Sequence, residues 1–313
     1  MLHRHNFAFA ITGAVILAAP LHTAAAQESG KSAPLVTALE QGKEMVYELV
    51  QHQEVSIPEM GATRETDITT VTALRVKEAG DGPALVGLTY EAMALAVSQQ
   101  GQSVAYDSRE PSDSPMAQQL KPLIDAVVGA TLDLRVAESG EVTEVEGLDA
   151  LLSGPMGQAL AQMLDEETLR RSFTQVFAVT PDRMTGSVGD TWTVTQRTPL
   201  DPNAAVVVEL TLKIERIEGG ETTISMTGDA NLELSEMAES QGISGEITDV
   251  RIEGTIQRNA EDGTLRSYEL NTAFELMTTT VDQMAPDAED AAPAETTRRI
   301  VVSQESRTTL QDS

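Results

Sequence analysis

Cysteine is absent from the 313 residues, and histidine occurs only four times. Without thiols the chain has no disulfide, no thiolate nucleophile and no thiolate zinc site. Since His3, His5 and His22 lie within the first 26 residues, only His52 remains beyond them. Beyond residue 26 the chain therefore cannot form a zinc site with three histidines, or an iron site with two histidines and a carboxylate. We expect no catalytic residue, no metal site and no cofactor.

A serine hydrolase would have to use His52 as its base. No G-x-S-x-G motif accompanies it, because Gly186-Ser187-Val188-Gly189 has the wrong spacing. We therefore expect His52 to be an ordinary strand residue. Carboxylates are plentiful, so an enzyme built on acids alone stays a third hypothesis, which would need clustered Asp and Glu in one deep pocket.

Aromatic and basic side chains are also scarce. Aromatics make up 3% of the chain, which disfavours a glycosidase because sugar sites usually use aromatic platforms. The 21 basic residues face 49 acidic ones, for a net charge of −28. Nucleic acids and anionic lipid headgroups repel such a chain, so we expect no nucleic-acid partner.

The only strongly apolar run lies near the N-terminus. Arg4 precedes the run from Phe7 to about Leu21, and Ala24-Ala25-Ala26 fits a cleavage site. Residues 1–26 are therefore predicted to be a secretory signal peptide. The alternative is an uncleaved anchor, but the run is shorter than the roughly 20 residues of a spanning helix. We expect a periplasmic or secreted protein with no integral membrane span after cleavage.

The remaining chain divides into a tail and one β-rich domain. Residues 27–34 are expected to be disordered, and residues 35–313 to form the domain. Two β halves, at about 43–111 and 188–313, flank a helical middle at about 114–177. A hairpin near residues 131–145 interrupts the helices.

The alternation of apolar and polar residues predicts the fold class. Val208, Leu210, Leu212 and Ile214 alternate with polar neighbours, as in strands with one buried face. Because the buried face needs a cover, we expect an α+β fold. Its curved, mainly antiparallel sheet or sheets would have a central helical segment covering the apolar face.

The helical middle carries its own start and stop signals. Ser114 and Asp165 are predicted to cap helices, and Pro122 to kink or split the first of them.

The two β halves resemble each other in places. Leu74–Glu78 is followed by Gly82 much as Leu212–Arg216 is followed by Gly220. This similarity indicates either a diverged repeat or merely two hairpins with glycine turns. Both alternatives stay open, as does the choice between one continuous sheet and two domains.

The central third resembles a known family. The resemblance rests on Leu120–Val128, Thr131–Leu134, Gly140–Val142, Leu169–Phe173 and Val188–Trp192. These segments are similar to exported bacterial proteins of unknown-function family 6263, a resemblance that implies no reaction or ligand. More loosely, the curved sheet with a helical plug resembles the periplasmic lipoprotein-carrier fold, although fold does not imply function.

Two functions fit these features. The first is an exported, non-catalytic binding or carrier protein with an apolar cavity for a lipid or acyl chain. Met226, Phe274, Leu276 and Trp192 are its predicted lining, although methionine more often fills cores and Trp192 also suits a core anchor. The second is a structural or interaction module with a filled core, which binds an envelope protein through a sheet edge or the acidic loop at about 284–296.

Overall fold

The computed structural model describes residues 31–80, 82–112, 114–115, 117–154, 157–161, 164–180, 182–201, 204–240, 242–282 and 294–311. The predicted signal peptide and most of the acidic loop lie outside the described residues. No helix in the described ranges combines the length and hydropathy that a membrane crossing requires.

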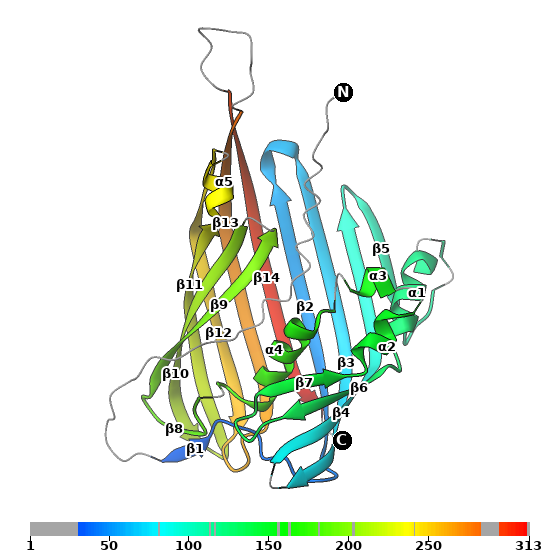
Figure 1. The fold of residues 1–313 in the computed structure, drawn as a ribbon, viewed down its shortest axis with the longest axis vertical. Helices are drawn as coiled ribbons and strands as arrows, with labels where there is room; N and C mark the ends of the chain where they lie inside the picture. The colour runs from blue at the N-terminus through cyan, green and yellow to red at the C-terminus, as the bar shows by residue number, and fades with distance from the viewer. Residues whose placement is uncertain are drawn as a thin grey trace.

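The described residues form one large antiparallel sheet of twelve strands (Figure 1). Its order is β7-β6-β4-β3-β2-β14-β13-β12-β11-β10-β9, with β5 paired to β4. The strands are β2 (Glu44–Ile57), β3 (Ala62–Gly80), β4 (Gly82–Gln99), β5 (Gln102–Asp107), β6 (Thr131–Val136), β7 (Val142–Glu146), β9 (Thr191–Asp201), β10 (Ala204–Glu218), β11 (Glu221–Leu234), β12 (Ile243–Asn259), β13 (Leu265–Asp282) and β14 (Ala294–Gln311). The predicted curved, mainly antiparallel sheet is confirmed.

The last strand joins the two β halves into this single sheet. β14 pairs with β2 from Gln311 opposite Val46 to Val301 opposite Ser56. Figure 1 shows the red β14 beside the blue β2. Apart from this pairing, strand neighbours along the chain are mostly neighbours in the sheet, as hairpin-connected antiparallel strands usually are.

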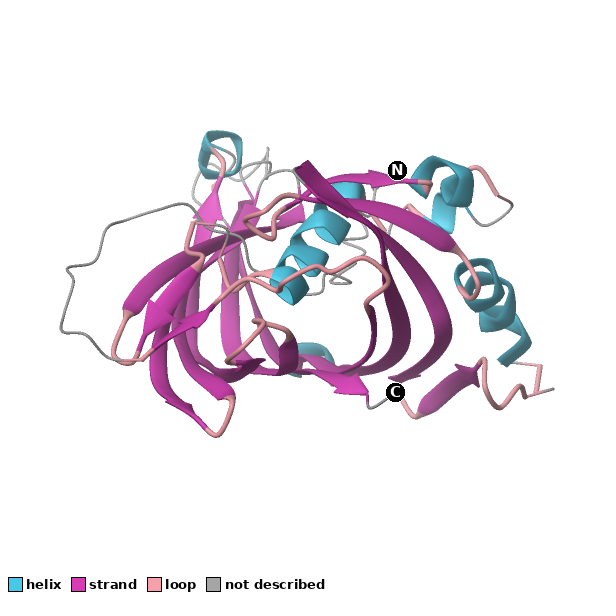
Figure 2. Cartoon of the chain, turned by 90° about the horizontal axis from the view of Figure 1, so that it is seen from below, coloured by secondary structure: helices cyan, strands magenta, loops and turns pink. Residues whose placement is uncertain are grey.

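The sheet bends strongly, and its pattern of burial follows the predicted alternation. Val208, Leu210, Leu212 and Ile214 of β10 are buried, while the residues that alternate with them, Glu209, Thr211 and Lys213, are exposed. Figure 2 shows the strands curving around a helix, α4 (Glu166–Phe177), which runs inside the bend. Register shifts between Val71 and Thr72 and between Thr248 and Arg251 are bulges, which locally bend and twist strands.

The helices are few and short. They are η1 (Pro58–Met60), α1 (Ala117–Val127), α2 (Leu148–Leu152), α3 (Gly157–Leu160), α4 and α5 (Glu236–Ser240). Ser114 caps α1 as predicted, since its Oγ accepts from Ala117 N at 3.1 Å. Of the two effects predicted for Pro122, a kink or a split, the split is wrong, because α1 runs through the proline. Ile124 and Val127 are buried beyond the proline, and their packing holds the helix together.

The predicted disordered tail is also wrong in part. Ser32–Pro34 forms β1, which pairs with β8 (Thr185–Ser187) in a separate two-stranded sheet. Directly after it, Leu35 is fully buried in the main core. This burial fixes the segment against the domain, a contact that the polar composition of residues 27–34 does not reveal. Residues 27–30 lie outside the described residues.

The N-terminus of α4 is capped as the sequence predicts. The Asp165 carboxylate accepts a hydrogen bond from Thr168 N at 2.9 Å. We expect Asp165→Ala to lower the free energy of unfolding by about 1 kcal/mol, the usual cost of losing a cap. Urea unfolding of the purified variant measures this, and Asp165→Asn serves as the control because asparagine caps equally well. An alanine variant as stable as the asparagine one would contradict the assignment.

Candidate ligand cavity

A cavity of about 240 Å³ lies between the concave face of the sheet, α4 and α1. The sheet supplies residues from β2, β3, β4, β13 and β14, which are its central strands. The described lining is Tyr47, Leu49, Gln51, Thr70, Thr72, Tyr90, Met93, Leu123, Val127, Leu160, Leu164, Thr168, Leu169, Ser172, Phe173, Gln175, Val176, Leu265, Tyr268, Ser306 and Thr308. This wall is mainly apolar, with hydroxyls and amides but no carboxylate, amine, guanidinium or imidazole among these residues.

Strand register creates the floor of the cavity. Pairing places Tyr268, Thr308, Leu49, Thr70 and Met93 in one row across β13, β14, β2, β3 and β4. Because side chains alternate between faces, residues opposite one another point to the same side of a sheet. The row therefore brings together residues from both ends of the chain.

A polar row crosses the same face four residues further along β13. It consists of Thr272, Gln304, Gln53 and Thr66, directly opposite one another on four adjacent strands. Thr272, Gln304 and Thr66 are buried, and Gln304 Nε2 donates to the Ser306 hydroxyl at 3.1 Å. The row separates the cavity from a second apolar cluster of Leu276, Ile300 and Val302.

Three tyrosines line the cavity, and burial shifts their titration further above neutral pH. Burial raises the pKa of Tyr90 to about 12, and raises the pKa of Tyr47 and of Tyr268 well above the ordinary value. The Tyr47 hydroxyl donates to Leu265 O at 3.2 Å. The Tyr268 hydroxyl is buried and has no hydrogen-bond partner within the described part of the chain.

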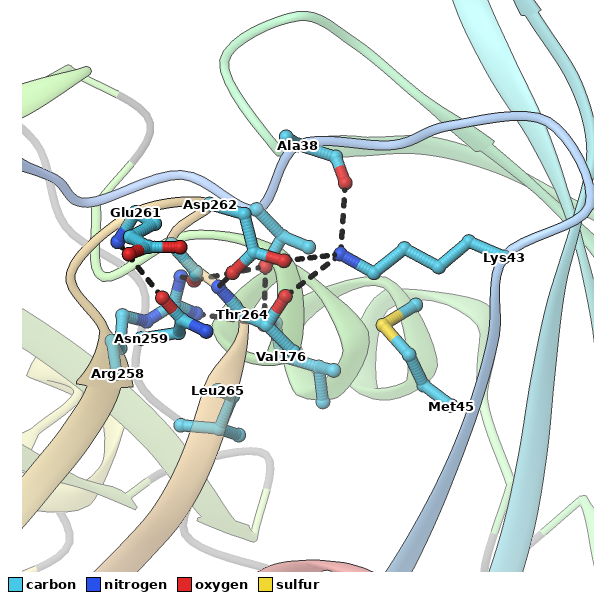
Figure 3. Close-up of polar contacts among 12 residues, drawn as sticks. Ala38, Lys43, Met45, Val176, Arg258, Asn259, Glu261, Asp262, Thr264 and Leu265 are labelled. Carbon is cyan, nitrogen blue, oxygen red and sulfur yellow. Dashed lines mark hydrogen bonds and ion pairs between the residues drawn. The ribbon is translucent and has the colours of Figure 1, made fainter. Parts of the chain in front are cut away.

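A fully buried arginine fixes the C-terminal end of α4, which forms one wall. Arg258, at the end of β12, donates from Nη1 and Nη2 to five backbone carbonyls, and Figure 3 labels one of the acceptor residues, Val176. These are Leu35 O at 3.1 Å, Phe177 O at 3.2 Å, Gly263 O at 2.7 Å, Gln175 O at 3.0 Å and Val176 O at 2.7 Å. Three of these carbonyls belong to the last turn of α4, whose carbonyls lack helical partners and attract cations. Burial lowers the pKa of Arg258 to about 10, so the group stays protonated at pH 7.

A second cation supports the same corner. Lys43 Nζ lies 2.8 Å from Asp262 Oδ2 and donates to Thr264 Oγ1 at 2.8 Å and Ala38 O at 3.2 Å (Figure 3). Burial of Asp262 favours its neutral form, but hydrogen bonds from Lys43 and Thr264 outweigh burial and lower its pKa. The β12–β13 turn, the N-terminal segment and α4 are thus tied together at one point.

The four residues predicted to line a cavity lie outside this lining. Met226 on β11 and Trp192 on β9 are buried in the main core, on strands several places away from β2–β4 in the order of the sheet. Leu276 is buried in the second cluster and Phe274 packs against it, beyond the polar row. All four therefore belong to apolar clusters, and they do not come together at one site. The prediction that they bind a ligand remains untested.

The sequence patterns did not predict that three tyrosines line the cavity. Tyr47, Tyr90 and Tyr268 all occupy buried positions in alternating strands. In the sequence, each of these tyrosines stands among aliphatic residues at the inward positions of its strand. A tyrosine at such a position buries its hydroxyl, which usually needs a hydrogen-bond partner. Strand order was needed to show that the three rings share one cavity.

His52 lies on the outer face of β2 as an ordinary strand residue. Its Nδ1 is 2.6 Å from Asp67 Oδ1, directly opposite on β3, and Glu305 lies opposite on β14. The described residues contain no group of three His, Cys, Asp or Glu arranged to hold a metal ion.

The His52–Asp67 pair makes stability depend on pH. The Asp67 hydrogen bond raises the pKa of His52 above 6.5 in the folded state. The stabilisation from the His52–Asp67 pair is therefore complete below pH 6.5, and it is lost as the pH rises through the raised pKa of His52 in the folded state. Both side chains are substantially exposed, so the pair contributes little. We therefore expect the free energy of unfolding of wild type to exceed that of His52→Gln by only about 0.5 kcal/mol near pH 5.5.

Urea unfolding at pH 5.5 and pH 9 measures this difference, which should vanish at the higher pH. The control is Asp67→Asn, in which the pH-dependent effect of His52→Gln should be much smaller, because only the weaker influence of Glu305 and Glu65 on the His52 pKa remains. An equal difference at both pH values would contradict the assigned pair.

Comparison with known proteins adds a family but no function. No curated protein matches the chain. Among solved structures, the β domain of the Bordetella autotransporter BrkA is 10% identical, with 86% of this chain and 99% of that chain covered and a TM-score of 0.24. Pseudomonas aeruginosa OccK5 (OpdH) is 8% identical, with 88% and 99% covered and a TM-score of 0.21. TM-scores this low carry no argument about fold or function.

A family model described as a family of unknown function (DUF6263) matches residues 81–265. The match runs from β4 to the start of β13, and it includes the hairpin β6–β7 and α4. It therefore contains the segments on which the resemblance was based. Since it spans more than half of the chain, this chain belongs to the family of unknown function DUF6263.

Proposed function

We propose that the protein is an exported, non-catalytic binding or carrier protein that holds the apolar part of a lipid-like ligand in the cavity between α4 and the sheet. The observation that carries the proposal is the cavity itself. Its described lining is mainly aliphatic and aromatic, with a few hydroxyls and amides. Ligand sites in proteins have this composition, with polar groups that orient the ligand.

The size of the cavity indicates what fits. A volume of about 240 Å³ corresponds to about eight waters, at roughly 30 Å³ each in the liquid. A short acyl chain, or one segment of a longer lipid, occupies comparable space.

We also propose that the central helical segment covers the apolar face of the sheet and so closes the cavity. Leu169 and Phe177 of α4 belong to the same buried cluster as residues of the sheet. The α4 residues Thr168, Ser172 and Val176 line the cavity opposite the strands.

A non-catalytic role without a cofactor agrees with the chemistry of the lining. Its hydroxyls have no neighbouring imidazole, carboxylate or amine within the described lining to activate them. Export remains a proposal that rests on residues 1–26, whose apolar run and Ala24-Ala25-Ala26 fit a signal peptide.

Native mass spectrometry of the protein, purified without detergent from the cells that make it, tests the proposal. We expect an additional mass in stoichiometric amount, which organic extraction releases as a lipid. An unliganded mass, together with no binding of added short-chain lipids, would overturn the proposal. It would favour the alternative of an interaction module, and cross-linking to envelope proteins would be the next experiment.

A further inference from the structure

Gln51 places an unpaired amide in the wall of the cavity. The residue lies on the inner face of β2, is only 8% exposed and lines the cavity. Within the part of the chain that the structure describes, its amide has no hydrogen-bond partner. The hydroxyl of Tyr268 is sealed from solvent, whereas both amide atoms of Gln51 keep accessible surface. Buried polar groups are nearly always paired, so this amide points to a polar group that occupies the cavity.

Two hydroxyls lie beside this amide on the neighbouring strands. Ser306 on β14 is directly opposite Gln51, and Thr70 on β3 is its diagonal neighbour, since Gln51 pairs with Ile68. Long side chains reach such diagonal neighbours. Both hydroxyls belong to the described lining, and the buried Thr70 hydroxyl also has no hydrogen-bond partner among the described residues. One amide and two hydroxyls therefore gather at one place in a mainly apolar wall.

The chemistry of these groups determines which ligand suits them. The Gln51 amide offers donors and an acceptor, and each hydroxyl can also donate and accept. The described lining contains no charged side chain, so an ionised headgroup would be buried without a counter-charge, which is strongly unfavourable. A hydroxyl or an amide, which also donates and accepts, pairs with Gln51 without that penalty.

We propose that Gln51 binds the hydroxyl or amide headgroup of an uncharged amphiphile, whose chain fills the apolar remainder of the cavity. This inference rests on the proposed function and specifies its ligand class. Gln51 is a specificity-determining residue for the headgroup, while the aliphatic lining provides affinity for the chain.

Three probes separate the headgroup from the chain: 1-heptanol, n-octane with the same number of non-hydrogen atoms, and sodium heptanoate. Their affinities are measured at pH 7.5 by displacement of the neutral dye 1-aminoanthracene, whose own affinity is determined for each variant. We expect Gln51→Leu to bind heptanol about 2- to 10-fold more weakly than wild type, the range for one hydrogen bond. Octane should bind this variant at least as tightly as wild type. We expect wild type to bind heptanoate about tenfold more weakly than heptanol, because the carboxylate lacks a counter-charge.

The matched control is Gln196→Leu, the same substitution at a buried glutamine of β9 outside the described lining. It should leave all three affinities unchanged. Gln51→Met is measured as a second variant, because methionine preserves the length of the side chain and removes only its polar end. Retained octane binding shows that the cavity of either Gln51 variant is still folded.

The possible failures are distinguishable. If wild type binds heptanol and octane, but the folded Gln51 variants bind heptanol as tightly as wild type does, the inference is overturned and the proposed function stands. A water held by Gln51 would give that result. Binding of heptanoate as tight as that of heptanol would overturn the preference for an uncharged headgroup. If wild type binds none of the probes, the proposed function and the inference both fail.

Discussion

Replacing Arg258 with methionine is expected to lower the free energy of unfolding by about 2–4 kcal/mol, because hydrogen bonds from a charged donor are lost in a buried place. The loss stays below the sum of five bonds because some carbonyls keep a second donor. Phe177 O also accepts from Thr37 N at 2.6 Å, and Leu35 O from Val179 N at 2.9 Å. Methionine preserves much of the side-chain length, so the change mainly removes the guanidinium. Urea unfolding measures the effect.

Two further variants make this test specific. Arg251→Met changes an exposed arginine on the same strand and should alter stability by no more than about 0.5 kcal/mol. Arg258→Lys should fall between wild type and Arg258→Met, since an ammonium cannot reproduce the planar geometry of the guanidinium. Equal stabilities of Arg258→Met and Arg251→Met would show that the five carbonyls do not depend on Arg258.

Replacing Thr70 with phenylalanine is expected to reduce binding of 1-aminoanthracene or a short acyl ester by about tenfold or more, equivalent to at least ~1.4 kcal/mol. Thr70 is buried in the middle of the row that forms the cavity floor. A phenyl ring there would fill much of the 240 Å³ that a ligand needs. Overpacking is expected to lower the free energy of unfolding by about 1–3 kcal/mol.

The matched control is Thr69→Phe. Thr69 precedes Thr70 in β3, and the alternation of strand side chains places it on the opposite face of the sheet. It adds the same ring to the same strand without entering the cavity, so probe binding should be unchanged. If both variants bind the probe like wild type, the cavity is not the binding site.

Local patterns predicted the elements because they depend on neighbouring residues. The alternation over Val208–Ile214 specified a strand with one buried face, and Asp165 specified the start of α4. The hairpin of β6 and β7 lies where alternation and a glycine turn placed it. The errors arose where distant contacts decided the outcome. Leu35 holds the expected tail against the core, and packing carries α1 through Pro122.

The candidate site depended even more on distant contacts. Met226, Phe274, Leu276 and Trp192 lie on inward or core positions, as alternation indicates. Alternation cannot tell which part of a long inner face is packed and which part is hollow. That depends on strand order and on where the helices end, and Arg258 fixes one helix end through carbonyls far away in the sequence.

The sequence by itself determined the acidic character of this protein, its lack of thiols, its scarcity of histidine, its antiparallel hairpins and its helix caps. These properties follow from composition or from residues a few positions apart. Only the tertiary structure decided that β14 pairs with β2, which joins the two halves into one curved sheet. That pairing places Thr308 beside Leu49 and so builds the floor of a cavity beneath α4. The reason is physical: an edge strand can pair with any partner, and the choice between partners is made by packing over the whole sheet.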